Sequence, residues 1–455
     1  MIKDCAAIVL AAGEGKRMRS SLPKVMHRAA GRPLAHWVTE AARNATGNKP
    51  VLVIGVGAQQ IRDYFGEDAA YAVQSEQLGT GHAVMAAMEY LKGDGYALVA
   101  AGDMPLLRAE TLRGVIDTAQ QNELGVCVLS AVLDDPTGYG RIIREGGHVQ
   151  CIVEHRDATE AQRAVCEINT SVYCFHIPAL LEALGALGNQ NDQGEYYLPD
   201  CVEYIVKKGY GAQAVVCADA QECLGVNDRA QLAAVAKVLR ARINTSLMQQ
   251  GVTMIDPDTV YIDAGVSVGR DAVIYPGVTL EGNTVIDEEA ILYPGSRIEN
   301  SFIGRGTKVQ NSVVLDSRVG EYSTIGPYAY LRPGSDVGSH CRVGDFVEVK
   351  NAQIHDGAKV SHLSYIGDGE IGEKTNVGCG VVFVNYDGKK KSRTVVGKNA
   401  FIGCNANLIA PVTIGDGAYV AAGSTVTNDV EGDALCVARA RQTVIPGWAK
   451  RRREE

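Results

Sequence analysis

Every sixth residue is aliphatic over long stretches of the second half of the chain. The first stretch comprises Ile262, Val268, Ile274, Leu280, Ile286, Leu292 and Ile298, and the same step recurs over residues 319–349 and 396–426. Neither the period of about 3.6 residues of a helix nor the two-residue period of a strand gives this step. A coil of three short strands per turn does, because one inward residue falls on each side. The pattern predicts a parallel β-helix of hexapeptide repeats with about 18 residues per turn.

Short apolar runs alternate with helical patterns in the first half. Residues 6–10, 51–54 and 96–100 are nearly continuous apolar runs, and residues 34–44 and 61–65 have the spacing of helices. Buried parallel strands read as continuous apolar runs, because both of their faces are covered. We therefore expect an α/β domain with a mostly parallel, Rossmann-like sheet. Ligands of such sheets bind at the carboxyl ends of the strands.

A stretch with helical spacing separates the two patterns and sets the expected domain limits. Its apolar positions are Leu232, Val235, Leu239 and Ile243. We expect an α/β domain over residues 1–228, a helical linker over 229–250 and the β-helix domain over 251–455, with a C-terminal tail from about residue 430. The polar, glycine-containing segment 382–394 interrupts the repeat, so we expect it to project as a functional loop.

Composition and charge narrow the classes of partner. The 455 residues include 44 Lys and Arg against 53 Asp and Glu, a net charge of −9 that argues against nucleic acid as the main partner. No segment approaches the roughly 18 apolar residues of a membrane span, and no signal peptide is visible. Twelve cysteines without a Cys-x-x-Cys pair are typical of free thiols in a reducing compartment. We expect a cytoplasmic protein with no membrane or nucleic-acid partner.

A glycine-rich basic loop over residues 10–18 follows the first apolar run, and Lys24 comes shortly after it. Gly13 and Gly15 would let backbone amides approach a polyphosphate closely. Arg17 and Lys24 could neutralise charge as a pyrophosphate leaves. A glycine loop can equally be a tight turn between a strand and a helix, so the loop alone does not establish a nucleotide site.

Asp103 follows another apolar run and is expected at the same edge of the sheet. A carboxylate at this place is a candidate ligand for Mg²⁺. An aspartate after a strand can also be a turn or helix-capping residue, and that alternative stays open on the residue type alone.

His362 is the candidate catalytic residue of the repeat half. Transfer of an acetyl group to an amine needs a base, and an imidazole suits that role near neutral pH. Arg332, Lys350 and Tyr365 lie 18 and 15 residues apart, so they can stack near one corner on successive turns. Glu348 could orient the histidine or pair with Lys350. The histidine could instead be structural, and the repeat a rigid spacer.

Further motifs lie in the first half, at residues 74–83, 135–141, 154–155, 167–170 and 225–227. Together with the loop and Lys24, they resemble the signature of sugar-1-phosphate nucleotidyltransferases. The whole chain resembles the bacterial bifunctional N-acetylglucosamine-1-phosphate uridylyltransferase / glucosamine-1-phosphate acetyltransferase family. That resemblance implies a left-handed β-helix, a homotrimer, and N-acetylation of glucosamine-1-phosphate by acetyl-CoA in the second half. It also implies Mg²⁺-dependent uridylyl transfer from UTP to N-acetylglucosamine-1-phosphate in the first half, with release of pyrophosphate, supplying a precursor for peptidoglycan and lipopolysaccharide.

The resemblance also implies roles for individual residues. In the first half, Arg17 and Lys24 are catalytic and Asp103 and Asn227 hold the metal. The nucleotide and sugar contacts are Leu10, Ala11, Ala12, Gly13, Lys24, Gln74, Gly79, Thr80, Ala101, Gly102, Asp103, Gly140, Glu154, Asn169 and Asn227. In the second half His362 is the base, and the amino-sugar phosphate contacts are Arg332, Lys350, Tyr365, Asn376 and Lys391. The acetyl-CoA contacts are Cys379, Asn385, Tyr386, Cys404, Ala422 and Arg439.

Three positions depart from the usual pattern of that family. Ala101 stands where a tyrosine is common, and Cys379 and Cys404 stand where small or hydroxyl residues are common. Nothing near Cys404 indicates an activated thiolate, so we interpret both cysteines as backbone-contact positions. Two alternatives remain from the residues: a single-activity nucleotidyltransferase whose β-helix serves only oligomerisation, and an inactive scaffold on the same fold.

Overall fold

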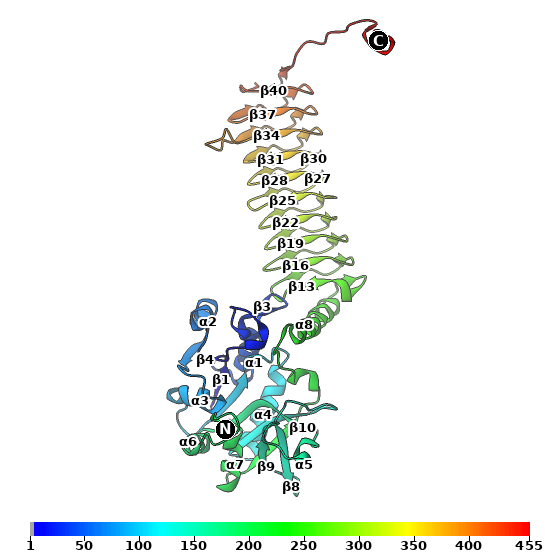
Figure 1. Cartoon of the computed structure of the whole chain (residues 1–455). Coiled ribbons are helices and arrows are strands. Elements are labelled where there is room, and N and C mark those ends of the chain that lie inside the picture. The colour runs from blue at the N-terminus through cyan, green and yellow to red at the C-terminus, as the bar shows by residue number, and fades with distance from the viewer. Residues whose placement is uncertain (1–3) are drawn as a thin grey trace. The chain divides into compact units, whose positions relative to one another are not determined.

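The computed structural model describes residues 4–455, which form two compact units that divide between Leu239 and Arg240 (Figure 1). This division lies within helix α8 (Arg229–Gln249), where the sequence predicts a linking helix. The functional domain limits at 228 and 251 stay a prediction. Across the described residues, each helix is too short or too polar to cross a lipid bilayer.

The first unit is built on a mostly parallel sheet with the strand order β11-β7-β10-β6-β1-β4-β5. The strands are β1 (Cys5–Leu10), β4 (Val51–Ile54), β5 (Ala70–Val73), β6 (Tyr96–Ala101), β7 (Val126–Val132), β10 (Glu167–His176) and β11 (Ala212–Val216). Strand β1 is parallel to both β4 and β6, as expected, whereas β10 runs antiparallel between β6 and β7. The hairpin of β8 (Arg141–Glu145) and β9 (His148–Val153) extends from β10.

Helices cover both faces of this sheet, which explains the continuous apolar runs. They are α1 (Leu34–Thr46), α2 (Ala58–Phe65), α3 (Thr80–Ala86), α4 (Ala109–Gln121), α6 (Ile177–Ala186) and α7 (Asp200–Lys207). The short helix α5 (Glu160–Arg163) buries no side chain. Val9 and Leu52 pack on the side of α1 and α4, whereas their neighbours Ile8 and Val53 pack on the side of α3, α6 and α7. Successive residues of a strand point to opposite faces, so a doubly covered strand must be apolar at every position.

The second unit is a left-handed parallel β-helix of hexapeptide repeats, with strands of two to four residues stacked into three parallel sheets (Figure 1). The predicted inward residues form one continuous core. The first break in the six-residue step does not interrupt the coil, because Ile303, Val309 and Val314 continue it with some sides one residue shorter. The coil also continues between 349 and 396, through Ile354, Val360, Ile366, Ile371, Val377 and Phe383.

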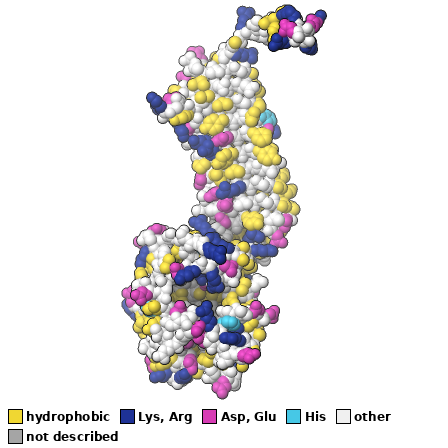
Figure 2. All heavy atoms as spheres, in the orientation of Figure 1, with side chains coloured by type: hydrophobic (Ala, Val, Ile, Leu, Met, Phe, Trp, Pro, Cys, Tyr) yellow, Lys and Arg dark blue, Asp and Glu magenta, His cyan; other side chains and the backbone are white. Residues whose placement is uncertain are grey.

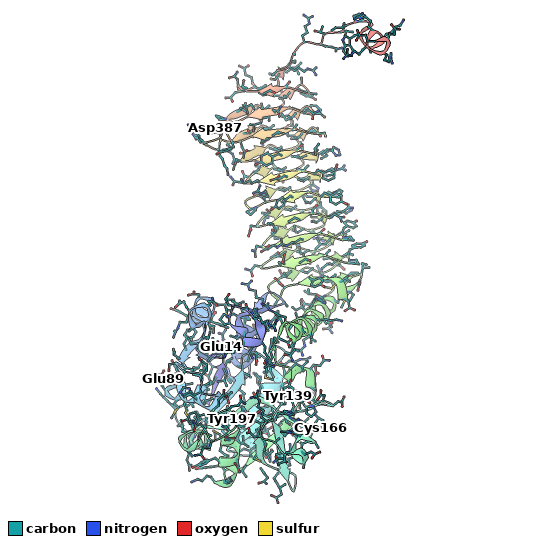
Figure 3. All side chains as sticks on the ribbon, viewed as in Figure 1. Glu14, Glu89, Tyr139, Cys166, Tyr197 and Asp387 are labelled. Atoms are coloured by element: carbon teal, nitrogen blue, oxygen red, sulfur yellow. The ribbon has the colours of Figure 1, made fainter. Side chains whose placement is uncertain are left out.

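One segment leaves the prism. It lies between β34 (Val382–Val384) and β35 (Thr394–Val396), so the predicted loop begins at residue 385 rather than 382. Its residue Asp387 points away from the stacked strands (Figure 3). After the last full coil, β41 (Leu435–Cys436) still pairs with β39 (Tyr419–Val420), and helix α9 (Trp448–Glu454) lies near the C-terminus.

Two candidate active sites

A cavity of about 420 Å³ lies at the carboxyl ends of β1 and β6 in the first unit. Its lining includes eleven of the predicted contacts: Leu10, Ala12, Gly13, Lys24, Gln74, Gly79, Thr80, Ala101, Asp103, Asn169 and Asn227. Five predicted residues are not part of this lining: Ala11, Arg17, Gly102, Gly140 and Glu154. Ala11 and Gly102 lie behind the wall, where their amides donate hydrogen bonds to the carbonyls of Val53 and Leu10. Arg17 is exposed on the loop.

The glycine-rich loop approaches Lys24 closely at Gly15. Gly15 has a φ of 65°, in the left-handed region, and a Cβ added there would lie 2.5 Å from the Cβ of Lys24. A larger residue at position 15 would therefore be strained and would displace the lysine. The loop is shaped by its glycine to set the position of Lys24 in the cavity.

Lys24, Asp103 and Asn227 converge at the floor of the cavity. The Lys24 ammonium forms a short hydrogen bond and ion pair with the Asp103 carboxylate. The same Nζ lies 3.4 Å from the amide oxygen of Asn227. The backbone carbonyl of Asp103 accepts a hydrogen bond of 2.9 Å from the amide of Val226, which holds the following Asn227 beside it. A carboxylate and an amide oxygen thus face one positive charge.

The opposite wall is formed by Gln74, Gly79 and Thr80. Gln74 is buried, and its side-chain amide donates a hydrogen bond of 3.1 Å to the carbonyl of Gly79. Gly79 has a φ of 108°, and an added Cβ would lie 2.6 Å from the carbonyl oxygen of Tyr196. Only glycine fits this backbone, because the strain and the clash would coincide. The wall therefore presents backbone and amide groups, which suit the edge of a flat polar ligand.

Asn169 reaches the cavity from a β-bulge in β10. The pairing of β10 with β7 shifts between Asn169 and Val172, and Ser171 between them has a φ of 62°. Bulges re-aim side chains in this way. The Asn169 amide nitrogen of the side chain donates to the buried Tyr173 hydroxyl at 2.7 Å, which fixes its orientation. The carbonyl of Gly140 accepts the Asn169 backbone N–H at 2.9 Å.

Glu154 lies beside Gly140 and is not part of the cavity lining. A Cβ added to Gly140 would lie 3.0 Å from its carboxylate oxygen. Burial raises the pKa of Glu154, and the nearby carboxylates of Asp157 and Asp200 raise it further. A carboxyl group with a raised pKa can donate as well as accept hydrogen bonds, so it can bind hydroxyl groups.

Ten lining residues were not among the predicted contacts, and Gln77, Tyr139 and Cys223 are three of them. Tyr139 lies within the motif at 135–141 and could have been chosen from it (Figure 3). Burial raises the pKa of its hydroxyl. Cys223 carries no sequence signal, because its place depends on the loop that brings Asn227 to Asp103.

The second cluster lies on one corner of the β-helix. His362 ends β30 (Lys359–His362), and Asp345 ends the strand below it, β27 (Arg342–Asp345). The two residues are register partners, and the His362 Nδ1 lies 2.8 Å from the Asp345 carboxylate. The next coils continue the corner, because the amides of Gly380, Asn405 and Gly423 bond to the carbonyls of Leu363, Cys379 and Cys404. Cys379, Cys404 and Ala422 thus stack beyond the histidine, and Arg439 donates to the Ala422 carbonyl at 3.0 Å.

The sheet on the other side of that corner carries three of the predicted phosphate contacts, Arg332, Lys350 and Tyr365. Its strands here are β25 (Tyr330–Leu331), β28 (Glu348–Lys350), β31 (Tyr365–Gly367) and β34. Arg332 follows β25 and forms an ion pair of 2.8 Å with Glu348. Glu348 therefore pairs with neither of its two expected partners, and Asp345 takes the place beside His362. Tyr365 stacks in register on Glu348 rather than on Lys350.

Asp368 joins several of the predicted residues and was missed from the sequence. Its carboxylate accepts hydrogen bonds from the side-chain amides of Asn385, at 2.5 Å, and Asn351, at 2.7 Å. Burial alone would raise the pKa of Asp368, but these hydrogen bonds and the charges of Lys391 and Lys350 lower it overall. Asp368 thus anchors Asn385, the first residue of the projecting loop, to the coil.

Asn376 and Tyr386 lie apart from this group. Asn376 begins β33 (Asn376–Val377) and pairs in register with Lys359, three residues before His362. Tyr386 is exposed in the projecting loop, where its hydroxyl donates to the Gly388 carbonyl at 2.7 Å. The His362 side chain is 54% exposed, so the corner lies at the surface of the chain.

Comparison with known proteins identifies the family of the chain. Residues 7–194 match the family model of the MobA-like NTP transferase domain, and residues 316–351 and 393–428 match the bacterial transferase hexapeptide model. A protein from Acetivibrio thermocellus named bifunctional protein GlmU is 49% identical over 97% of this chain and 96% of its own length. Proteins of that name from Clostridium perfringens strain SM101 and Clostridioides difficile are 48% and 46% identical, over 98% and 99% of this chain and 99% and 98% of their own lengths. The chain therefore belongs to the family of bifunctional GlmU proteins, and it is an enzyme with N-acetylglucosamine-1-phosphate uridylyltransferase and glucosamine-1-phosphate N-acetyltransferase activities.

Proposed function

We propose that the cavity of the first unit and the His362 corner of the second are the sites of the two activities. Glucosamine-1-phosphate is acetylated at the corner, and its product, N-acetylglucosamine-1-phosphate, is uridylylated in the cavity. The observation that carries the proposal is that three central residues of each predicted set lie together: Lys24, Asp103 and Asn227 in the cavity, and Arg332, Tyr365 and His362 around one corner.

Uridylyl transfer in the cavity needs positioning and charge neutralisation. The sugar phosphate attacks the α-phosphorus of UTP in line, and no protein nucleophile is required. Gln74 and the Gly79 backbone would hold the uracil edge, and Asn169 would hold the sugar. The half-buried Glu154, beside Gly140, stays a predicted sugar contact outside the cavity lining. Lys24 would neutralise charge on the phosphates as pyrophosphate leaves.

The same cavity fits Mg²⁺, because the oxygens of Asp103 and Asn227 already face one cation, the Lys24 ammonium. Within residues 4–455 no group of three or more His, Cys, Asp or Glu side chains is placed to hold a metal. Mg²⁺ is typically bound by one or two protein side chains, and substrate phosphates and water complete its coordination shell. Bound there, the ion would neutralise phosphate charge.

Acetyl transfer at the corner needs a base and a binding site for an extended thioester. The neutral His362 would accept a proton from the amino nitrogen as that nitrogen attacks the acetyl carbonyl. The C–S bond then breaks, and the proton passes to the coenzyme A thiolate. Arg332 and Lys350 would bind the sugar phosphate, and the column of Cys379, Cys404 and Ala422 would contact acetyl-CoA along the stacked coils.

A homotrimer is the assembly that we propose for the β-helix, because an exposed apolar column adjoins the acetyl-transfer corner. Tyr328, Phe346 and Leu363 occupy equivalent places on successive coils, and each is 59% exposed. The rings of Tyr328 and Phe346 stack at 5.5 Å. Figure 2 shows many hydrophobic side chains on the visible face of this unit. Apolar columns of this kind favour burial against another subunit, and such a neighbour would border the open site.

We also propose that the enzyme works in the cytoplasm. All twelve cysteines are free thiols, as is usual in a reducing compartment.

The proposed homotrimer is tested by light scattering. The measured mass should be three times the mass of the chain, whereas a monomer with full acetyl transfer would contradict the trimer.

Two assays test the proposed sites. Thiol release from acetyl-CoA should require glucosamine-1-phosphate, and pyrophosphate release from UTP and N-acetylglucosamine-1-phosphate should stop when EDTA removes Mg²⁺ and resume when Mg²⁺ is restored. A protein blank corrects for its own cysteines. Pyrophosphate release without any amino-sugar-dependent thiol release would support the alternative of a single-activity enzyme with a scaffolding β-helix.

A further inference from the structure

The side chain that faces the proposed base is Asp345, one coil below it. Asp345 and His362 are register partners at the ends of adjacent parallel strands, and 2.8 Å separates the carboxylate oxygen from Nδ1. The residue after each of them, Phe346 and Leu363, adopts a positive φ of 56° and 40°, respectively. The chain turns the corner there, so both side chains stay at the same edge of the prism.

This hydrogen bond determines which imidazole nitrogen is free. An ionised carboxylate can only accept, so Nδ1 must carry the hydrogen and the lone pair of the neutral ring lies on Nε2. The hydrogen bond from His362 and the charge of Arg342 keep the pKa of the Asp345 carboxyl below its usual value, so it is ionised at neutral pH. His362 is 54% exposed at its side chain, which leaves Nε2 accessible to a ligand on the surface.

We propose that Asp345 is the positioning residue of the acetyl-transfer reaction: it holds His362 in the tautomer and orientation in which Nε2 is the base. The inference rests on the proposed role of His362. In the reaction Nε2 takes the proton of the attacking nitrogen, the N–C bond forms and the C–S bond breaks, and the proton goes to the coenzyme A thiolate. Asp345 takes no proton; it stabilises the imidazolium that exists between the two transfers.

The chain offers a matched control for this pair. His355 and Glu370 are also one coil apart, with 2.9 Å between Nε2 and the carboxylate, and they lie in β29 (Gln353–Ile354) and its following turn and in β32 (Gly369–Ile371), on a different face. Glu370→Gln removes a carboxylate from a surface histidine as Asp345→Asn does, and Glu370 is not a residue of either proposed site. It also removes the 3.4 Å ion pair of Glu370 with Arg393, so the control tests a larger loss of charge pairing. Any effect of charge removal in general should appear equally in the two variants.

The test compares kinetics and an NMR signature in the full-length enzyme. Asp345→Asn should lower kcat for acetyl transfer about tenfold to a hundredfold, with little change in KM for glucosamine-1-phosphate, because phosphate binding by Arg332 and Lys350 is retained. In protein labelled with ¹⁵N-histidine, the signal lost in His362→Ala should show Nδ1–H in the native enzyme and shift toward Nε2–H in Asp345→Asn. Glu370→Gln should change neither quantity.

The outcomes separate this inference from the proposed function. Wild-type kcat in Asp345→Asn, or a lost rate with an unchanged tautomer, would overturn the positioning role while leaving His362 as the base. Full activity in His362→Ala would instead overturn the proposed function itself. If Asp345→Asn melts well below Glu370→Gln, Asp345→Glu supplies the test, because a longer carboxylate should restore the Nδ1–H tautomer together with part of kcat.

Discussion

The ammonium of Lys24 donates to the carboxylate of Asp103, the side chain that we propose as a ligand of Mg²⁺. Lys24→Ala should lower uridylyl transfer about a hundredfold to a thousandfold, because a group that stabilises the leaving pyrophosphate is lost. Without nucleotide the variant should bind Mg²⁺ more tightly than the native enzyme, because no ammonium competes for Asp103.

Isothermal titration with Mg²⁺ and a pyrophosphate-release assay would measure the two effects. Lys92→Ala serves as the control, since Lys92 is an exposed lysine of the same unit outside the cavity lining. Weaker Mg²⁺ binding in Lys24→Ala than in the native enzyme would show that Lys24 does not occupy the metal position.

A buried glycine keeps the two strands of the acetyl-transfer corner in register. A Cβ at Gly344 would lie 2.0 Å from the carbonyl oxygen of Ser361, directly before Asp345 and His362 on the two strands. Gly344→Ala should therefore separate the pair, lower acetyl transfer at least about tenfold and destabilise the β-helix by about 1–3 kcal/mol, as overpacking does. Uridylyl transfer should not change.

The matched control is Gly114→Ala, because Gly114 lies exposed in helix α4 with open space around it. That change should be neutral or slightly stabilising, by up to about 1 kcal/mol. Both activities and the thermal midpoint would be measured for each variant. An unaffected acetyl transfer in Gly344→Ala would contradict the close packing of the corner.

The sequence predicts the parts of the fold in which burial repeats along the chain. It predicts less well the parts that depend on how neighbouring strands are aligned. Continuous apolar runs and the six-residue step follow from burial alone, so the strands and the inward residues agree with the structure. Asp345 was not predictable in the same way. It lies 17 residues before His362 because one side of that coil is a residue short, whereas a regular coil of about 18 residues places Gly344 there.

In the cavity, too, the positions that depend on strand pairing could not be predicted from the sequence. Motif positions identified most of its lining, because the motifs lie in loops and strand ends that border the cavity. The antiparallel strand β10 and its bulge, which aim Asn169, leave no periodic pattern in the sequence. The role of Asp368 was also not predictable from the sequence, because it depends on the hydrogen bond from Asn385, which lies 17 residues later in the chain.

The inward residues of the β-helix should dominate its stability. Leu292 is fully buried, whereas its neighbour Ile291 on β18 (Ile291–Leu292) is half-buried. Leu292→Ala should lower the free energy of unfolding of this unit by about 2–5 kcal/mol, the range for a large aliphatic residue removed from a core. Ile291→Ala should lower it by clearly less. Denaturant titrations followed by circular dichroism would compare them, and equal losses would contradict the inward assignment.

Thiol reactivity should divide the cysteines according to burial. Burial raises the pKa of Cys127 and Cys201 to about 12 and that of Cys341 to about 11. The thiolate is the reactive form, so these residues should not react with a disulfide reagent at pH 8. Cys166 and Cys404 are exposed and should react first. Mass spectrometry after brief labelling would identify the sites, and early labelling of Cys127 would contradict the packing of the sheet.

Two variants assayed for both reactions test the central claim, which is that one chain carries two separate active sites. Asp103→Ala should abolish uridylyl transfer and leave acetyl transfer intact, whereas His362→Ala should do the reverse, each in a protein that keeps the native circular dichroism and assembly. Loss of both activities in either folded variant would contradict the account.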